Sequence, residues 1–144
     1  MNPTPTAAFG DKVNRVDYLV RKGAYVVIVD GDSVAAIQGP GGYYFLPGGG
    51  IEENESDEET LIRELKEECD ASVEILGLMG QATDFLFAAG EDRYFEKRGS
   101  FYLARFLTLP DKNLVWIPIP DASKLFRQEG HVWAIKQALE KRKA

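Results

Sequence analysis

Carboxylate side chains are concentrated in one segment of the chain, and their spacing suits the binding of a cation. Between residues 51 and 70 the sequence has ten acidic residues and two basic ones. On a helix, Glu64, Glu67 and Glu68 would share one face, because residues three and four apart are neighbours there. Like charges on neighbouring turns repel by roughly 0.2–0.5 kcal/mol per exposed pair, and a divalent cation would reverse that sign. Mg²⁺ prefers carboxylate and water oxygens of this kind.

Arg63 lies among these acidic residues and is placed to orient one of them. Glu59 precedes it by one helical turn, Glu67 follows it by one turn, and Glu55 lies just upstream of the expected helix. If the guanidinium makes two hydrogen bonds to one of these carboxylates, it would fix the orientation of that carboxylate. The same spacing is also typical of a surface helix with ordinary ion pairs between turns, so spacing alone leaves both interpretations open.

A glycine-rich loop, Pro47-Gly48-Gly49-Gly50, comes directly before the acidic segment. Backbone without side chains can approach a ligand or a metal closely. Ser56 followed three residues later by Glu59 is the pattern of a capping box, which predicts a helix from about Asp57 to Cys69. The sequence therefore predicts a glycine loop that leads straight into an acidic helix.

The combined pattern resembles the signature of the Nudix hydrolases. Gly49 is followed after five residues by Glu55 and, after seven more, by Arg63-Glu64-Leu65-Lys66-Glu67-Glu68. Two positions depart from the family pattern, which usually has glycine in place of Asp70 and a branched aliphatic residue in place of Ala71. Aspartate tolerates the left-handed backbone of a helix end better than most residues, so we expect a small cost in stability and an intact site.

The resemblance implies an α/β fold, namely an α/β/α sandwich in which a mixed β-sheet lies between helices. It also implies metal-assisted attack of water on a diphosphate linkage in a nucleoside diphosphate joined to another moiety. By carry-over, the ligands of Mg²⁺ or Mn²⁺ would be Glu64, Glu67, Glu68 and the carbonyl of Gly49. The residues assigned to catalysis are Glu64, Glu67, Arg63 and Glu55, with Glu55 and Arg63 as an orienting pair.

The general base varies within the family. It is either one of the helix glutamates or a carboxylate from a distant loop, for which Glu91, Glu96 and Glu129 are the candidates here. For each of these three, a solvated surface charge is the more ordinary role.

Aromatic and basic residues outside the signature are candidates for substrate contacts. Tyr44, Phe45 and Tyr94 could stack on a nucleobase, and Arg98 could meet a phosphate. Core packing or surface exposure is the more ordinary role for any single one of them. His131 could donate a hydrogen bond to a substrate, but one histidine at a helix start is more often structural.

The remaining sequence predicts strands that alternate with a few helices in a single domain, 1–144. Strands are expected at residues 24–29, 33–37, 43–46, 73–87, 100–107 and 114–117, and helices at 121–126 and 131–141. Residues 90–99 are expected to form a loop near the site, and residues 1–12 a loosely ordered N-terminal arm. This order predicts an α/β layered domain with a mixed sheet.

Composition limits the partners. A formal net charge of −6 argues against binding to a nucleic-acid polymer, since phosphate backbones are held by clustered Lys and Arg. One cysteine and one histidine exclude an internal disulfide and a Cys/His zinc cluster. Because no export or membrane signal is visible, we expect a cytoplasmic enzyme that acts on a small nucleotide derivative, with the strand over residues 100–107 available for a homodimer.

Two alternatives to the hydrolase come from other classes. A nucleotide-sensing module with the same fold would bind without cutting, and loss of a ligand residue would favour it, yet none is lost. A diphosphate-handling isomerase would call for a catalytic cysteine near its pocket, whereas Cys69 lies inside the expected helix. The sequence does not single out one nucleotide derivative as the substrate.

Overall fold

Two β-sheets lie at the centre of the molecule in the computed structural model, which describes residues 4–110 and 113–143. The larger sheet has the strand order β1-β7-β8-β2-β6. Its strands are β1 (Thr6–Phe9), β2 (Leu19–Val27), β6 (Gly48–Gly50), β7 (Val73–Ala88) and β8 (Arg93–Phe106). Two neighbouring pairs, β1 with β7 and β2 with β8, are parallel and the others are antiparallel, so the sheet is mixed.

The smaller sheet is antiparallel and is organised around one strand. Its strands are β3 (Val29–Asp30), β4 (Ser33–Gln38), β5 (Tyr44–Phe45) and β9 (Leu114–Pro118), and β4 pairs with each of the other three. A 3₁₀ turn, Pro40–Gly42, joins β4 to β5. The chain passes from the end of β2 in the larger sheet into β3 of the smaller sheet after a single residue.

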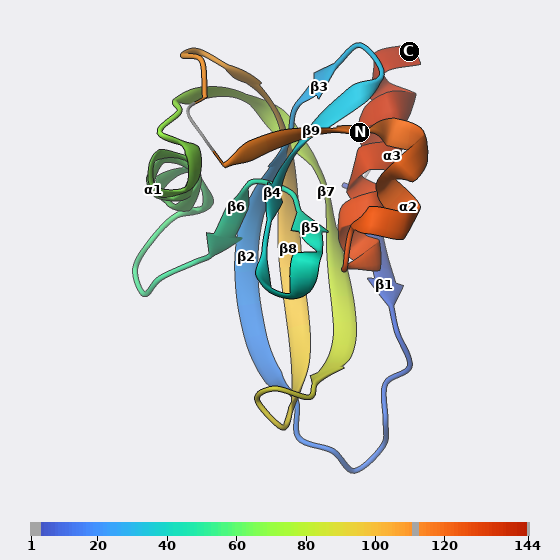
Figure 1. Ribbon diagram of the computed structural model, residues 1–144. Helices are drawn as coiled ribbons and strands as arrows, with labels where there is room; N and C mark the ends of the chain where they lie inside the picture. Colours follow the sequence, from blue (N-terminus) through green and yellow to red (C-terminus); the bar gives the residue numbers. More distant parts are fainter. Residues whose placement is uncertain (1–3, 111–112, 144) are drawn as a thin grey trace.

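Helices cover opposite sides of the sheets (Figure 1). Helix α1 (Asp57–Cys69) lies on one side, where Leu61 and Leu65 pack with Ala24 and Val26 of β2. On the other side are α3 (Glu129–Lys143) and the short α2 (Ala122–Leu125), which follows a 3₁₀ turn at Ile119–Asp121. Buried residues of α3 there join a cluster with Val27, Leu46 and Phe101. The predicted α/β sandwich with a mixed sheet between helices is confirmed.

The polar stretch 90–99 is mostly strand, so the prediction of a loop there is wrong. Strand β8 begins at Arg93, and only a short turn separates it from β7. The strand pairs with β7 on one edge and with β2 on the other, so its backbone groups are hydrogen-bonded even where its side chains are polar. Residues 100–103 are paired on both edges, whereas the pairing with β2 ends at Leu103, so a homodimer through residues 100–107 stays a prediction.

The N-terminal segment is more ordered than the sequence predicts. Residues 1–3 lie outside the described part of the chain, but Thr6–Phe9 form β1, whose register with β7 begins at Thr6 opposite Gln81. Residues 6–9 of the expected N-terminal arm therefore dock on the domain as a strand, and a loose arm over the rest of residues 1–12 stays a prediction. The partner strand of β1 lies about 75 positions away in the sequence, so local patterns carried no sign of it. No helix in the described residues is long and apolar enough to cross a membrane.

Candidate active site

Helix α1 is fixed at both ends, which sets the direction in which its glutamates project. At its start, the Ser56 hydroxyl accepts a hydrogen bond from the Glu59 N–H (3.1 Å), and the Glu59 carboxylate accepts one from the Ser56 N–H (3.0 Å). At its end, Asp70 adopts the left-handed conformation with φ 49° and ψ 41°. The predicted bounds, capping box and left-handed aspartate are all confirmed. The helix therefore begins at Asp57, directly after the loop that leads from Gly50 to Ser56.

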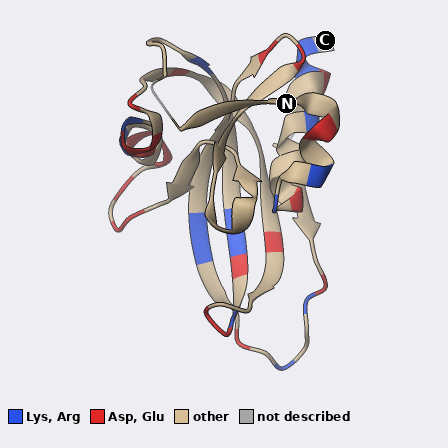
Figure 2. Cartoon of the chain, in the orientation of Figure 1, with Lys and Arg blue, Asp and Glu red and all other residues tan. Residues whose placement is uncertain are grey.

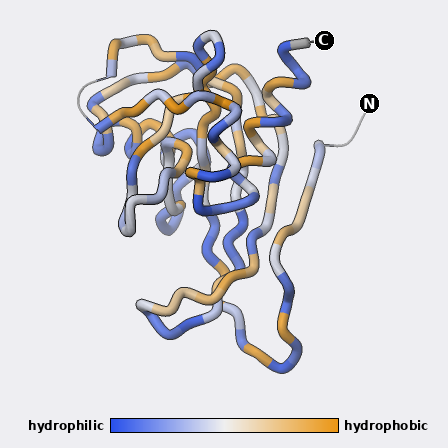
Figure 3. Tube along the Cα trace, turned by 45° about the vertical axis from the view of Figure 1, so that its right-hand side comes forward, coloured by the Kyte–Doolittle hydropathy of each residue, from blue (hydrophilic) through white to orange (hydrophobic). Residues whose placement is uncertain are grey.

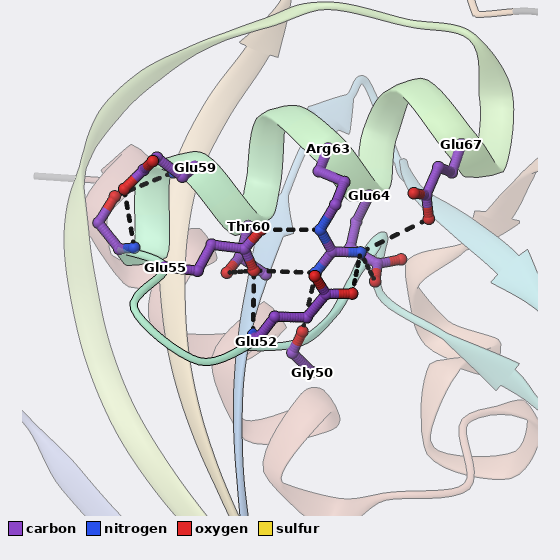
Figure 4. A network of polar contacts seen from close by, with 9 residues as sticks. Gly50, Glu52, Glu55, Glu59, Thr60, Arg63, Glu64 and Glu67 are labelled. Carbon is purple, nitrogen blue, oxygen red and sulfur yellow. Dashed lines mark hydrogen bonds and ion pairs between the residues drawn. The ribbon is translucent and has the colours of Figure 1, made fainter.

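Arg63 holds Glu55 through two hydrogen bonds (Figure 4). Its Nε donates to Oε2 of Glu55 at 2.7 Å and its Nη2 donates to Oε1 at 2.9 Å. The buried hydroxyl of Thr60 donates to the same carboxylate at 2.6 Å. These bonds, with the Arg63 bond as the largest cause, lower the pKa of Glu55 to about 2. Glu55 is therefore a permanently charged partner for Arg63, and of the carboxylates that the sequence left open it is the one engaged at two points.

The same guanidinium reaches β6 (Gly48–Gly50), here called the glycine strand, and three further glutamates, of which Glu52 has its Oε1 3.6 Å from Nη1. Nη2 donates to the carbonyl of Gly50 at 3.1 Å, and Nη1 donates to Oε1 of Glu64 at 2.8 Å. Nη1 also lies 3.5 Å from Oε2 of Glu67, whose side chain is 60% exposed. Arg63 thus connects α1, the loop before it and β6, and it leaves Glu67 facing solvent (Figure 4).

Bare backbone of β6 lies directly against two of the helix glutamates. A Cβ atom placed on Gly49 would lie 2.6 Å from Cδ of Glu64, so only glycine leaves that carboxylate where it is. The N–H of Gly48 donates to Oε1 of Glu68 at 3.0 Å, and Gly48 has φ of 137°, which favours glycine. Gly48 is thus required both by its backbone conformation and by space, since a Cβ there would lie 2.2 Å from the carbonyl oxygen of Ala24, and Gly49 is required by space.

The carboxylates of α1 crowd one another. Burial, together with the charges of Glu64 and Glu67, raises the pKa of Glu68 to about 7, although the Gly48 N–H acts in the opposite direction. A divalent cation would relieve this repulsion. The helix carboxylates and the adjacent glycine backbone offer such a cation oxygen ligands only. The residues therefore suit a hard cation. Within the described residues no three acidic, histidine or cysteine side chains already converge as a ready-made metal site, since Arg63 engages Glu64 and Glu67 points outward.

Comparison with known proteins agrees with this arrangement. A family model described as the NUDIX domain matches residues 19–143. The chain belongs to the Nudix family. The comparison with curated proteins found no match.

Solved structures show the same fold as this Nudix domain. A MutT NUDIX hydrolase from Burkholderia pseudomallei is 22% identical, with a TM-score of 0.65 over 83% of this chain and 98% of that chain. A MutT protein from Bacillus halodurans is 27% identical, with a TM-score of 0.61 over 83% and 82%. An ADP-ribose pyrophosphatase from Streptococcus suis is 18% identical, with a TM-score of 0.60 over 86% and 92%.

A cavity of about 630 Å³ begins beside the Nudix glycine strand, on the α3 side of the larger sheet. Gly50 and Ile51 line one end of it. The other lining residues are Val20, Arg21, Lys22, Gly23 and Tyr25 of β2, Asp84 of β7, Glu91, Phe95, Lys97, Arg98, Gly99 and Phe101 of and near β8, and Gln128 and His131 near the start of α3. The cavity is thus continuous with the backbone that contacts the Nudix glutamates.

Basic residues stand opposite one another on two strands of this cavity, although the chain as a whole is acidic. Arg21 lies opposite Lys97, and Lys22 opposite Arg98, in the parallel pairing of β2 with β8 (Figure 2). Figure 3 shows the same neighbouring stretches as hydrophilic. Burial, followed by the charge of Arg127, lowers the pKa of Lys97. Like charges that lie directly opposite one another on paired strands repel. An anionic ligand bound near them would offset this repulsion.

The sequence candidates for substrate contacts are only partly brought together. Arg98 lines the cavity but is paired with Glu96. Tyr94 does not line it, whereas its neighbour Phe95 does. Tyr94 instead packs edge-on against Phe87, with ring centroids 4.8 Å apart.

Tyr44 and Phe45 lie on β5 and do not line this cavity either. Phe45 reaches it only indirectly, since its ring is 6.1 Å from that of His131. Glu91 does line the cavity, and Glu129 begins α3. Of the three carboxylates that the sequence offered as a distant base, Glu91 is therefore the one that lines this cavity.

Sequence reasoning did not single out Tyr25, Asp84 or Gln128. Tyr25 lies in a continuous apolar run, and Gln128 has no feature that marks it. Asp84 did carry a signal, because it is an acid inside the mainly apolar stretch Ala82–Phe87 that was predicted as a strand. The structure buries it at 7% exposure, where burial raises its pKa.

Proposed function

We propose that this Nudix protein hydrolyses a diphosphate linkage in a nucleoside diphosphate joined to another moiety, with Mg²⁺ or Mn²⁺ bound at α1. The observation that carries the proposal is the contact between the glycine backbone and the helix carboxylates: Gly49 against Glu64 and the Gly48 N–H on Glu68, with Arg63 joining helix and strand. Its chemistry suits a cation that must also contact phosphate oxygens.

The residues proposed to hold the cation are Glu64, Glu67, Glu68 and the carbonyl of Gly49. When bound, a divalent ion would neutralise the diphosphate and lower the pKa of a water ligand. Glu64 and Glu68 are already held, by Arg63 and by the Gly48 N–H, so little ordering remains for them. Glu67 is exposed and would have to turn from Arg63 toward the site.

Arg63 and Glu55 have a positioning role in this proposal. Their salt bridge fixes the guanidinium, and the guanidinium in turn fixes Glu64 and the Gly50 carbonyl. A carboxylate must also accept the proton of the attacking water, and the candidates are a helix glutamate and Glu91 on the cavity wall. Arg21 and Lys97 line the cavity beyond the glycine strand, where they would attract the anionic substrate.

The decisive experiment measures release of phosphate or nucleoside monophosphate from nucleoside triphosphates, nucleoside-diphosphate sugars, ADP-ribose and dinucleoside polyphosphates. Each substrate is tested with Mg²⁺, with Mn²⁺ and with excess chelator. Metal-dependent turnover of one class supports the proposal and names the substrate. Tight binding across the panel without any turnover would instead favour the nucleotide-sensing alternative.

A further inference from the structure

His131, in the first turn of α3, accepts a hydrogen bond from the segment that leads into the glycine strand. Its Nδ1 accepts from the N–H of Leu46 at 3.1 Å, so Nδ1 carries no proton. Burial, followed by the charge of Lys97, lowers the pKa of His131 to about 3, which keeps the ring neutral with its one proton on Nε2. The imidazole is therefore a permanent acceptor for the Leu46 N–H.

The second ring nitrogen makes no comparable contact. Among the described residues the buried Nε2 of His131 has no hydrogen-bond partner. The side chain is only 1% exposed, so the hydrogen bond to a substrate that the sequence allowed does not fit this structure. A leucine would fill much of the same space without burying an unpaired donor, but it could not accept from Leu46. What the imidazole supplies here is thus the acceptor at Nδ1.

The larger sheet fixes the place of this imidazole. The rings of Tyr25 on β2 and Phe101 on β8 lie 4.5 Å and 5.4 Å from it, centroid to centroid. The backbone just before His131 is held as well, because the carboxylate of Asp84 on β7 accepts the N–H of Gly130 at 3.2 Å. Nδ1 therefore has a position that three strands of the sheet determine.

Two residues after Leu46, the chain contacts a glutamate of α1. The N–H of Gly48 donates to Oε1 of Glu68 at 3.0 Å. The residue between them is Pro47, whose ring fixes its own φ and whose carbonyl accepts the N–H of Val26 at 2.9 Å. The step from Leu46 to Gly48 therefore has little freedom, and a displacement of the Leu46 N–H would displace the Gly48 N–H with it.

We propose that His131 is a positioning residue for the metal site: by holding the Leu46 N–H it sets the place of Gly48, and through Gly48 the place of Glu68. The inference rests on the proposed function, in which Glu68 is a ligand of the cation. Without the acceptor, an unpaired N–H in the core would be unfavourable, so the segment would move toward water or another acceptor. Loss of a partner that orients a metal ligand weakens metal binding by about 10–100-fold.

Two substitutions at this position separate the acceptor from the bulk of the side chain. In His131→Asn the amide oxygen can replace Nδ1 as the acceptor for Leu46, whereas His131→Leu keeps apolar bulk and has no acceptor. Mn²⁺ binding is measured without substrate, from the electron paramagnetic resonance signal of free Mn²⁺. We expect His131→Leu to weaken Mn²⁺ binding by about tenfold or more, and His131→Asn to stay within about threefold of wild type. Equal Mn²⁺ affinities of His131→Leu and wild type would overturn the inference.

A control variant separates positioning from stability. Ile135 is a core residue of the same helix with 1% exposure, and Ile135→Ala loosens the packing of α3 but keeps the acceptor at His131. At a temperature at which every variant is folded by circular dichroism, we expect Ile135→Ala to bind Mn²⁺ as the wild-type protein does. Equal losses of Mn²⁺ affinity in Ile135→Ala and His131→Leu would show that His131 acts through stability alone, and would contradict the positioning role.

A measurement on the unaltered protein covers the case in which His131→Leu does not fold. The chain has a single histidine, so NMR of ¹⁵N-labelled protein reports the His131 ring directly. On addition of Mg²⁺ we expect the amides of Gly48 and Leu46 and the Nδ1 of His131 to shift together, while the amide of Gly31, in the turn between β3 and β4, stays in place. A shift at Gly48 without shifts at Leu46 and His131 would overturn the inference.

None of these measurements uses turnover, so the two proposals can fail separately. If the variants bind Mn²⁺ in the expected order but the wild-type protein hydrolyses nothing in the substrate panel, the proposed function fails and the positioning role stands. If the wild-type protein turns over a substrate and His131→Leu binds Mn²⁺ equally well, only the positioning role fails. A wild-type protein that binds no Mn²⁺ would count against both.

Discussion

Arg63 and Glu55 meet through a two-point salt bridge, with Nε–Oε2 at 2.7 Å and Nη2–Oε1 at 2.9 Å. Eight residues separate them, and the loop between them turns so that the arginine also reaches the carbonyl of Gly50. This one guanidinium therefore relates the loop, the helix and the glycine strand to one another. The planar guanidinium is required, because a lysine ammonium does not present two N–H donors in a fixed geometry.

We predict that Arg63→Lys lowers kcat/KM by about 10–100-fold although the charge is kept, since the carboxylates proposed to bind the cation lose the partner that fixes their geometry. Steady-state kinetics with a substrate identified from the panel, and circular dichroism for the fold, check this. Lys66→Arg on the same helix is the matched control, because Lys66 pairs with the exposed Asp70 and with no other acid among the described residues. A kcat/KM for Arg63→Lys within threefold of wild type would contradict the positioning role.

Adjacent glycines provide a second matched pair of variants. Gly49→Ala places a Cβ 2.6 Å from Cδ of Glu64, whereas the atom nearest to a Cβ on Gly50 is the carbonyl oxygen of Lys22 at 4.0 Å. The Glu64 side chain can move aside, so we expect Gly49→Ala to fold and to lose about 10²-fold in turnover as its carboxylate is displaced. Gly50→Ala should keep turnover within a few fold. Equal activities of the two variants would show that Glu64 does not need its present position.

Glu67 tests the ligand assignment itself. Glu67→Gln keeps the size of the side chain and removes one charge from an electrostatic site, so we expect about 10²-fold or greater loss of metal-dependent turnover with the fold intact. Its side chain is 60% exposed, which makes a large loss of stability unexpected. Glu58→Gln, an exposed glutamate in the first turn of the same helix, is the control. Turnover by Glu67→Gln within twofold of wild type would remove Glu67 from the proposed ligands.

The lowered pKa of His131 leads to a prediction of how the free energy of unfolding changes with pH. Its pKa falls from 6.5 to about 3 on folding, so below pH 6.5 the unfolded chain binds a proton that the folded chain does not. Stability is therefore fully present above pH 6.5 and decreases as the pH falls toward 3, by about 1.4 kcal/mol per pH unit at most. Urea denaturation of wild type and His131→Asn between pH 7 and pH 4.5, with chelator present, isolates this contribution. Parallel curves for the two proteins would show that the pKa of the histidine does not fall on folding.

Local chemistry made the Nudix helix predictable from sequence. The capping box at Ser56 and Glu59, the acidic stripe and the left-handed Asp70 all act within a few residues, and the helix has the predicted bounds. The choice of Glu55 as the partner of Arg63 was not decided by spacing alone. It depends on the path of the loop, which brings Glu55 beside Thr60 as well.

Features that depend on distant partners were missed. Strand β8 begins in the polar residues from Arg93 onward because β7 and β2 pair with it on both edges, and neither pairing leaves a periodic pattern in so polar a stretch. The contact of Asp84 with Gly130 joins positions 46 residues apart. Burial of these groups, and hence the shifted pKa of His131, follows from the assembled fold and cannot be read from composition.

The hydrogen bond from the Leu46 N–H to His131 spans 85 positions and connects the segment just before the glycine strand to α3. During translation the signature residues leave the ribosome well before His131 does. The nascent chain can form α1 and the Arg63 salt bridge early, since all their atoms come from one local segment. The segment leading into Gly48 gains this anchor only after α3 docks, so the glycine strand receives this support later than the contacts within the signature segment form.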